Sequence, residues 1–190
     1  MGLRPRGARR PAAAGLLGAP APRRGQPLTR LAIISDTHLT RGARRLPEAA
    51  AAHVRAADLV LHAGDISTPE ALAELEALGR PILAVCGNVD VAEVRARLPE
   101  RRVVEAGGRR IGMIHDAGPA RGRLERLRRA FPGADAVVFG HSHVPLHEQA
   151  PDGFAIFNPG SPTQRRRQPH ATMGLATAGP GGVAFELVRV

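Results

Sequence analysis

Polar residues of the kinds that bind divalent metal ions follow several apolar segments of this 190-residue chain. They are Asp36, His38, Asp65, Asn88, His115, His141 and His143. Carboxylate, amide and imidazole ligands without a thiolate suit divalent transition metals, and we take Mn²⁺ as the first choice, with Ni²⁺, Fe²⁺, Co²⁺ and Zn²⁺ as alternatives. The set is large enough for two ions. Because two neighbouring cations repel each other, one shared carboxylate is the natural arrangement, and we assign that position to Asp65.

Two such ions, roughly 4 Å apart, can generate a bridging hydroxide at neutral pH and neutralise the oxygens of a phosphoester during in-line displacement. The residues therefore predict metal-dependent hydrolysis of a small-molecule phosphoester, with Asp65, Asn88 and His141 as the catalytic residues. Imidazole binds metal only in its neutral form, so activity should fail in mild acid.

Periodicity and turn residues predict the elements that position these side chains. Strands are expected at residues 30–35, 58–62, 81–86, 101–105, 109–115, 134–139, 146–150, 154–158, 172–178 and 183–190. Helices are expected at residues 47–57, 69–78 and 119–130, with a short one after Asp90. Thr68 should cap the second of these helices. Strands alternate with helices first and stand alone later, which predicts two packed sheets with helices outside.

The expected ligands share one location, just beyond the carboxyl end of a strand. Binding sites of open α/β sheets form at that edge, so residues far apart in sequence can converge there. A glycine directly precedes Asp65, Asn88 and His141, which permits tight turns and a close approach of the backbone.

The same residues lie in motifs that resemble those of the calcineurin-like metallophosphoesterases. The motifs are Asp36-Thr37-His38, Gly64-Asp65, Gly87-Asn88, His115, Gly140-His141-Ser142-His143 and Asn158-Pro159-Gly160-Ser161. Their order and spacing most closely resemble the small bacterial and archaeal phosphodiesterase branch of that superfamily, over about residues 30–190. The resemblance implies an α/β fold, a four-layer αββα sandwich of two mixed β-sheets flanked by helices. It also implies one metal held by Asp36, His38, Asp65 and His143, and another held by Asp65, Asn88, His115 and His141.

One position departs from the pattern of many relatives, which carry a histidine after the Gly-Asn pair. This chain has Gly87-Asn88-Val89-Asp90, and Val89 cannot transfer a proton to a leaving group. A positioned general acid is typically worth about 10² to 10⁴ in rate, so hydrolysis of esters with poor leaving groups should suffer, and the expected substrates are phosphodiesters with acceptable leaving groups. The small diesterase branch resembles this chain in lacking that histidine. For Asp90 we prefer a capping role on the following helix to a catalytic one.

Two further residues are assigned to the neighbourhood of the metals. Arg166, in a run of three arginines after the Asn-Pro-Gly-Ser loop, is expected to bind a phosphate oxygen together with Asn88, and plain surface charge is the alternative. His62 lies three residues before Asp65 and is expected to hydrogen-bond behind the ligands, with a packed strand histidine as the alternative.

The net charge of +10 is concentrated at one end of the chain. Residues 1–30 contain seven Arg and no acid, whereas the other 20 Arg stand against 17 acidic residues. Residues 1–28, rich in Arg, Ala, Pro and Gly, are expected to form a disordered tail rather than an export signal, ahead of one phosphoesterase domain at 29–190. With a single Cys and no apolar run near the roughly 20 residues of a membrane span, we expect a soluble, cytoplasmic protein without membrane contact. The oligomeric state stays open, a homo-oligomer included.

Two other functions deserve comparison. A nuclease would use the same two-metal chemistry, but the absence of Trp and Tyr makes a stacking platform for bases hard to build, so nucleic acid is not the favoured substrate. A non-catalytic scaffold of the same fold resembles the metal-poor retromer subunit, which has lost ligands. This chain retains the full ligand set, which favours the enzyme.

Overall fold

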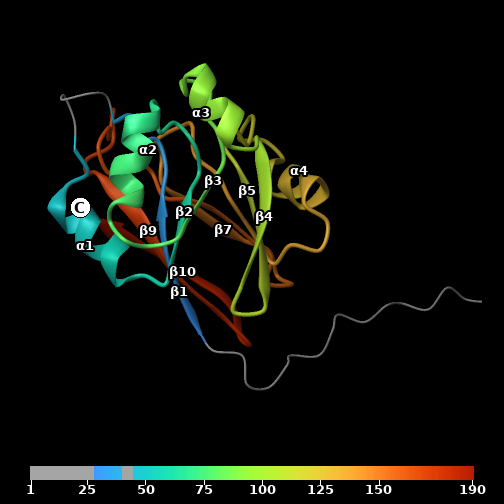
Figure 1. Ribbon diagram of the computed structural model, residues 1–190. Helices are drawn as coiled ribbons and strands as arrows, with labels where there is room; N and C mark the ends of the chain where they lie inside the picture. Colours follow the sequence, from blue (N-terminus) through green and yellow to red (C-terminus); the bar gives the residue numbers. More distant parts are fainter. Residues whose placement is uncertain (1–27, 40–44) are drawn as a thin grey trace, which may run out of the picture.

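The computed structural model describes residues 28–39 and 45–190 and contains two five-stranded sheets (Figure 1). The first sheet has the order β10-β9-β1-β2-β3 and consists of β10 (Gly182–Arg189), β9 (Thr172–Gly179), β1 (Thr29–Ile34), β2 (Leu59–His62) and β3 (Ile82–Ala84). The second has the order β4-β5-β6-β8-β7 and consists of β4 (Arg101–Ala106), β5 (Arg109–Ile114), β6 (Ala136–Val138), β8 (Ala155–Asn158) and β7 (Leu146–Gln149). Both sheets are mixed: β1, β2 and β3 run parallel, as do β5, β6 and β8, while the remaining pairs are antiparallel.

The helices are α1 (Glu48–Ala56), α2 (Pro69–Glu76), α3 (Ala92–Arg97) and α4 (Arg123–Ala130). Side chains alternate along each strand, so one face of a sheet can pack on the other sheet while the opposite face packs on helices. In β1, Leu31 and Ile33 lie in the core between the sheets, whereas Ala32 and Ile34 belong to the core shared with α1 and α2. A third core joins α4 to the outer face of the second sheet. The four layers confirm the predicted αββα sandwich (Figure 1).

Local chemistry explains where these elements begin and turn. Thr68 caps α2 as predicted, since its hydroxyl accepts a hydrogen bond from the Ala71 N–H at 3.2 Å. The β4–β5 hairpin turns through Gly107 and Gly108, which have φ of 55° and 74°. Two residues with positive φ form the type I′ turn whose twist matches that of the paired strands.

The helix predicted at residues 119–130 begins later than expected. It starts at Arg123, because Gly122 adopts a left-handed conformation with φ of 66° and interrupts the helical path. The preceding loop is held by the Arg126 guanidinium, which donates hydrogen bonds to the carbonyl oxygens of Ala117 and Pro119. Arg126 therefore stabilises the loop that precedes its own helix.

Two sequence predictions concern the ends of the structure and its environment. The tail predicted at residues 1–28 lies outside the described residues except for Leu28. Among the helices of the described ranges, none combines the length and the apolar character needed to cross a bilayer.

Candidate metal centre

The residues predicted as metal ligands come together at one edge of the sandwich. Asp36, Asp65 and Asn88 follow the parallel strands β1, β2 and β3 of the first sheet. His115 and His141 follow β5 and β6, which are parallel neighbours in the second sheet. The carboxyl ends of both sets of strands therefore meet, which is where α/β sheets place their sites.

One group of facing atoms consists of Asp36, His38, Asp65 and His143. The Nε2 atoms of His38 and His143 lie 3.1 Å apart, and the two rings stack with centroids 5.0 Å apart. Asp36 Oδ1 lies 3.3 Å from His143 Nε2, and Asp65 Oδ2 lies 3.7 Å from His38 Nε2. These atoms surround one small volume at the end of β1 and β2.

The second group consists of Asp65, Asn88, His115 and His141. His115 Nε2 lies 3.3 Å from Asp65 Oδ2 and 3.1 Å from Asn88 Oδ1. His141 Nδ1 lies 2.9 Å from the same Asn88 oxygen. Asp65 Oδ2 thus faces both groups, which is the position the sequence analysis gave to a shared carboxylate.

Hydrogen bonds on the far side of two rings decide what the facing nitrogens can do. His115 Nδ1 lies 2.7 Å from the carbonyl oxygen of Ala63, and His143 Nδ1 lies 2.6 Å from that of Gln164. A carbonyl only accepts, so each Nδ1 carries the proton and each neutral ring turns its Nε2 lone pair toward the carboxylates.

Hydrogen-bond acceptors therefore outnumber donors at this centre. Buried Asp36 Oδ1 accepts no hydrogen bond from the described residues. Ligand atoms of Asp36, His38 and His143 all lie within 4.8 Å of one another, as do those of Asp36, Asp65 and His115. A buried acceptor without a donor is costly, and a cation removes that cost. The donor set fits divalent metal ions.

The backbone at these residues adopts a conformation that side chains normally avoid. Asp36, His38, Asp65, His141 and His143 have positive φ, between 43° and 68°. Such a conformation costs about 1 kcal/mol or more for each residue and persists where the surrounding structure imposes it. It sets the direction of the chain at five candidate ligands, and no sequence periodicity reports it.

Close backbone approach explains two of the glycines in the motifs. A Cβ on Gly140 would overlap the Ser35 hydroxyl and lie 2.7 Å from Asp36 Oδ2, and a Cβ on Gly87 would overlap the Asp65 carboxylate. The predicted close approach is confirmed at both positions. The absent side chains leave room for two carboxylates.

Burial and neighbouring charges shift the pKa values in opposite directions. Burial raises the pKa of Asp36 to about 6, although His115 and the Ser35 hydroxyl oppose the rise. Burial alone would raise the pKa of Asp65, but the hydrogen bond and charge that His115 offers when its ring is protonated outweigh burial and lower that pKa to about 2. Burial lowers the pKa of His115, yet Asp65 and Asp36 outweigh this and raise it. Burial lowers the pKa of His143 to about 4. The two carboxylates make the centre a place that attracts positive charge.

His62 lies behind the ligands and is completely buried. Its Nδ1 accepts a hydrogen bond from the Gly64 N–H at 3.2 Å, so its Nε2 carries the proton and donates to Thr37 Oγ1 at 3.0 Å. Burial, together with the charge of His115, lowers the pKa of His62 to about 3 and keeps the ring neutral. His62 thereby joins β2 to the loop that carries Asp36 and His38.

A second supporting segment was not assigned roles from the sequence. Ser161, the last residue of the Asn-Pro-Gly-Ser motif, donates its Oγ hydrogen to the Asp36 carbonyl at 2.8 Å, and Thr163 Oγ1 donates to the Thr37 carbonyl at 2.6 Å. Gln164 supplies the carbonyl that orients His143. The hydroxyl-bearing residues at the end of the motif and just after it were the available signal.

Asp90 does not cap α3, contrary to the prediction. The helix begins at Ala92 without a side-chain cap, and the buried Asp90 carboxylate accepts hydrogen bonds from the Ser67 N–H at 2.6 Å and the Gly87 N–H at 2.7 Å. One N–H donor from the loop after β2 and one from its own loop satisfy the carboxylate better than the start of a short, exposed helix. Asp90 therefore joins the loop after Asp65 to the loop before Asn88.

The remaining assigned positions lie at the rim. Val89 is 44% exposed and donates its backbone N–H to Asp65 Oδ1 at 3.0 Å. Arg166 is exposed, has φ of 49°, and lies close enough for its charge to lower the pKa of His143, after the larger effect of burial.

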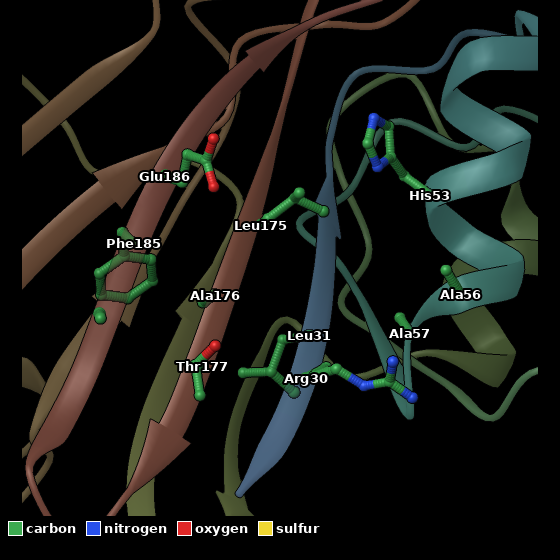
Figure 2. A pocket seen from close by; sticks show the side chains of 11 residues that line it. Arg30, Leu31, His53, Ala56, Ala57, Leu175, Ala176, Thr177, Phe185 and Glu186 are labelled. Atoms are coloured by element: carbon green, nitrogen blue, oxygen red, sulfur yellow. The ribbon is translucent and has the colours of Figure 1, made fainter.

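A separate cavity of about 330 Å³ lies away from the metal centre, between α1 and the strands β1, β9 and β10 (Figure 2). Its walls include His53 on α1, Leu175 on β9 and Glu186 on β10. None of the seven predicted ligands lines it. The predicted metal ligands therefore lie at the edge where the two sheets meet and not in this cavity.

Residues 29–179 match the family model of the calcineurin-like phosphoesterase superfamily domain. A curated probable metallophosphoesterase of Methanothermobacter thermautotrophicus is 37% identical over 151 residues, which are 78% of this chain and 86% of that protein. The chain belongs to the calcineurin-like phosphoesterase superfamily, as the motifs indicated.

Solved structures share the fold. An archaeal phosphodiesterase aligns with a TM-score of 0.67 and 22% identity, covering 85% of this chain and 99% of that one. The vacuolar protein sorting protein Vps29 of Entamoeba histolytica, solved with Zn²⁺, aligns with a TM-score of 0.63 and 22% identity, covering 84% and 98%. At these identities the likeness concerns the fold alone.

Proposed function

We propose that this chain is a metal-dependent phosphodiesterase with two divalent ions at the candidate centre. The observation that carries the proposal is the convergence of carboxylate, amide and imidazole lone pairs on two small volumes that share Asp65 Oδ2. In the neutral rings of His115 and His143 the single proton lies on Nδ1, where it is donated to a backbone carbonyl. The Nε2 lone pair of each ring is therefore available to a metal ion.

The ligands divide between the two ions as the distances group them. Asp36, His38, Asp65 and His143 would hold one ion, and Asp65, Asn88, His115 and His141 would hold the other. When bound, such ions, with Mn²⁺ as our first choice, supply a reactive water at neutral pH and offset the negative charge of a phosphoester.

The residues themselves contribute orientation and charge. The Val89 N–H donates a hydrogen bond to Asp65 Oδ1, which orients the carboxylate. The Asn88 side-chain oxygen faces the imidazoles of His115 and His141, so it points into the second group of ligands. Arg166, exposed beside His143, would bind a non-bridging phosphate oxygen through its guanidinium.

A diester is the substrate class that the rim favours. Val89 stands where a histidine would protonate a leaving group, and its side chain offers no proton. Turnover therefore depends on leaving groups that depart without an acid.

The experiment is reconstitution of metal-free protein with Mn²⁺ or Ni²⁺, followed by turnover of bis-p-nitrophenyl phosphate and p-nitrophenyl phosphate. We expect metal-dependent hydrolysis with preference for the diester. Asp65→Asn and His141→Ala should abolish it, whereas His147→Ala, outside the ligand set, should not. Metal-independent turnover would exclude the metal-dependent mechanism, and no turnover with any metal would exclude the enzyme and leave a scaffold of the same fold. Preference for the monoester would overturn the diester assignment.

A further inference from the structure

A small cavity adjoins the metal centre on the side of Asn88 and His115. Its volume is about 230 Å³, and its walls come from the segment between β3 and α3, from α3, from the start of β4 and from the end of β5. Asn88 and His115 form part of the wall. An ester arm of a substrate whose phosphorus sits at the centre therefore has this cavity within reach.

Two arginines line the cavity and lack an acidic partner. Arg95 on α3 donates only a 3.4 Å hydrogen bond, to the Gly87 carbonyl. Arg101 begins β4 and lies in register with Ile114, the residue before His115. Neither guanidinium forms an ion pair with a carboxylate of residues 28–39 or 45–190, whereas Arg128 is paired with an acid.

The same wall also carries two acids, Glu100 and Asp116, so the formal charges of the lining balance. Neither acid forms an ion pair with Arg95 or Arg101 among the described residues, and Asp116 instead accepts a 2.7 Å hydrogen bond from the Gly118 N–H. Both guanidiniums therefore keep N–H donors for a ligand, and the cations proposed for the adjoining centre add the positive charge that attracts an anion.

We infer that Arg95 and Arg101 bind a second anionic group of the substrate, a phosphate or a carboxylate carried on one ester arm. Guanidinium presents paired N–H donors that match both anions. The inference rests on the proposed function and narrows its substrate class to phosphodiesters with an additional negative charge near the scissile bond.

The test is calorimetric binding to the Mn²⁺-loaded full chain of three product-like ligands: glycerol 3-phosphate, 3-phosphoglycerate and glycerol 1,3-bisphosphate. The last two add a carboxylate and a phosphate, respectively. We expect at least one of them to bind about tenfold more tightly than glycerol 3-phosphate, because a hydrogen bond to a charged group is worth that much. The tighter one identifies the anion.

The variants separate the cavity from general charge. Arg95→Gln with Arg101→Gln should remove the preference, and Arg97→Gln, on the same helix but paired with Glu76, should retain it. Glu100→Gln should strengthen the preference, since it removes the opposing charge.

Equal binding of all three ligands, or a preference that survives the double variant, would overturn the inference while turnover of the simple diester keeps the proposed function standing. No metal-dependent binding of glycerol 3-phosphate and no turnover would remove both. Circular dichroism and thermal unfolding of each variant distinguish lost recognition from lost folding.

Discussion

Replacing Asp36 with Asn should stabilise the metal-free protein and abolish binding of the ion that Asp36 helps to hold. Burial raises the pKa of Asp36 from 3.8 to about 6, so the folded chain holds an ionised carboxylate at pH 8 only at a cost. Each pKa unit corresponds to about 1.4 kcal/mol, which gives about 3 kcal/mol. Asn carries no charge, and its amide N–H₂ can donate to the lone pair of His143 Nε2, now 3.3 Å from Asp36 Oδ1.

The raised pKa of Asp36 also predicts how the free energy of unfolding changes with pH. A raised carboxyl pKa contributes stability that is complete below the unfolded value near 4 and is lost as pH rises through about 6. We therefore expect the free energy of unfolding of Asp36→Asn to exceed that of the wild type by about 3 kcal/mol at pH 8, and by less than about 1 kcal/mol at pH 4. For a chain of this length 3 kcal/mol corresponds to about 6 to 12 °C in Tm.

The assay is urea unfolding of metal-free protein at both pH values, repeated with saturating Mn²⁺ at pH 8. Metal at 100 times its Kd should stabilise the wild type by about 3 kcal/mol for each ion bound, and Asp36→Asn should lose the share that comes from the ion Asp36 helps to hold. Asp116→Asn, an exposed carboxylate that accepts a hydrogen bond from Gly118, is the matched control and should change stability by less than about 0.5 kcal/mol. An Asp36→Asn protein less stable than wild type at pH 8, or one that Mn²⁺ stabilises as much as the wild type, would refute the reasoning.

Three further predictions follow from the same site. Mn²⁺ affinity should fall at least tenfold between pH 7 and pH 5, because Asp36 becomes protonated near pH 6 and the raised pKa of His115 favours a proton over the ion; an unchanged Kd in calorimetric titrations would contradict this. Asp90→Asn should cost about 1 to 3 kcal/mol in urea unfolding and weaken Mn²⁺ binding, since the amide cannot accept both N–H bonds; unaltered stability would show that Asp90 does not hold the two loops. Gly140→Ala should reduce Mn²⁺ binding by displacing Ser35 and Asp36, whereas Gly181→Ala, with no heavy atom within 4 Å of the new Cβ, should not; equal binding by both would argue against the close approach.

Much of the fold could be predicted because its determinants are local. The continuous apolar run of β1, the Thr68 cap and the paired glycines after β4 act within a few residues, so the strands, helices and turns appear in the pattern itself. The start of α4 could not, because the left-handed conformation of Gly122 and the reach of Arg126 back to Ala117 depend on the loop's packing.

The candidate site shows the same division. Residue types and motif order indicated which side chains could bind metal, and their places after parallel strands indicated that they would meet. The capping role predicted for Asp90 was wrong because two sets of N–H donors compete for this carboxylate. One set is the first turn of α3, and the other is the Ser67 and Gly87 N–H groups, which only the packed loops bring to it.

The sequence by itself determined the family, the two-sheet architecture and the list of candidate ligands, because each depends on residue identity and order along the chain. The tertiary structure decided how those ligands point: the positive φ of five of them, the carbonyls that fix the His115 and His143 tautomers, and the arginines that share a cavity with Asn88. These features join residues from different strands and loops, and their energies exist only once the two sheets have packed and excluded water.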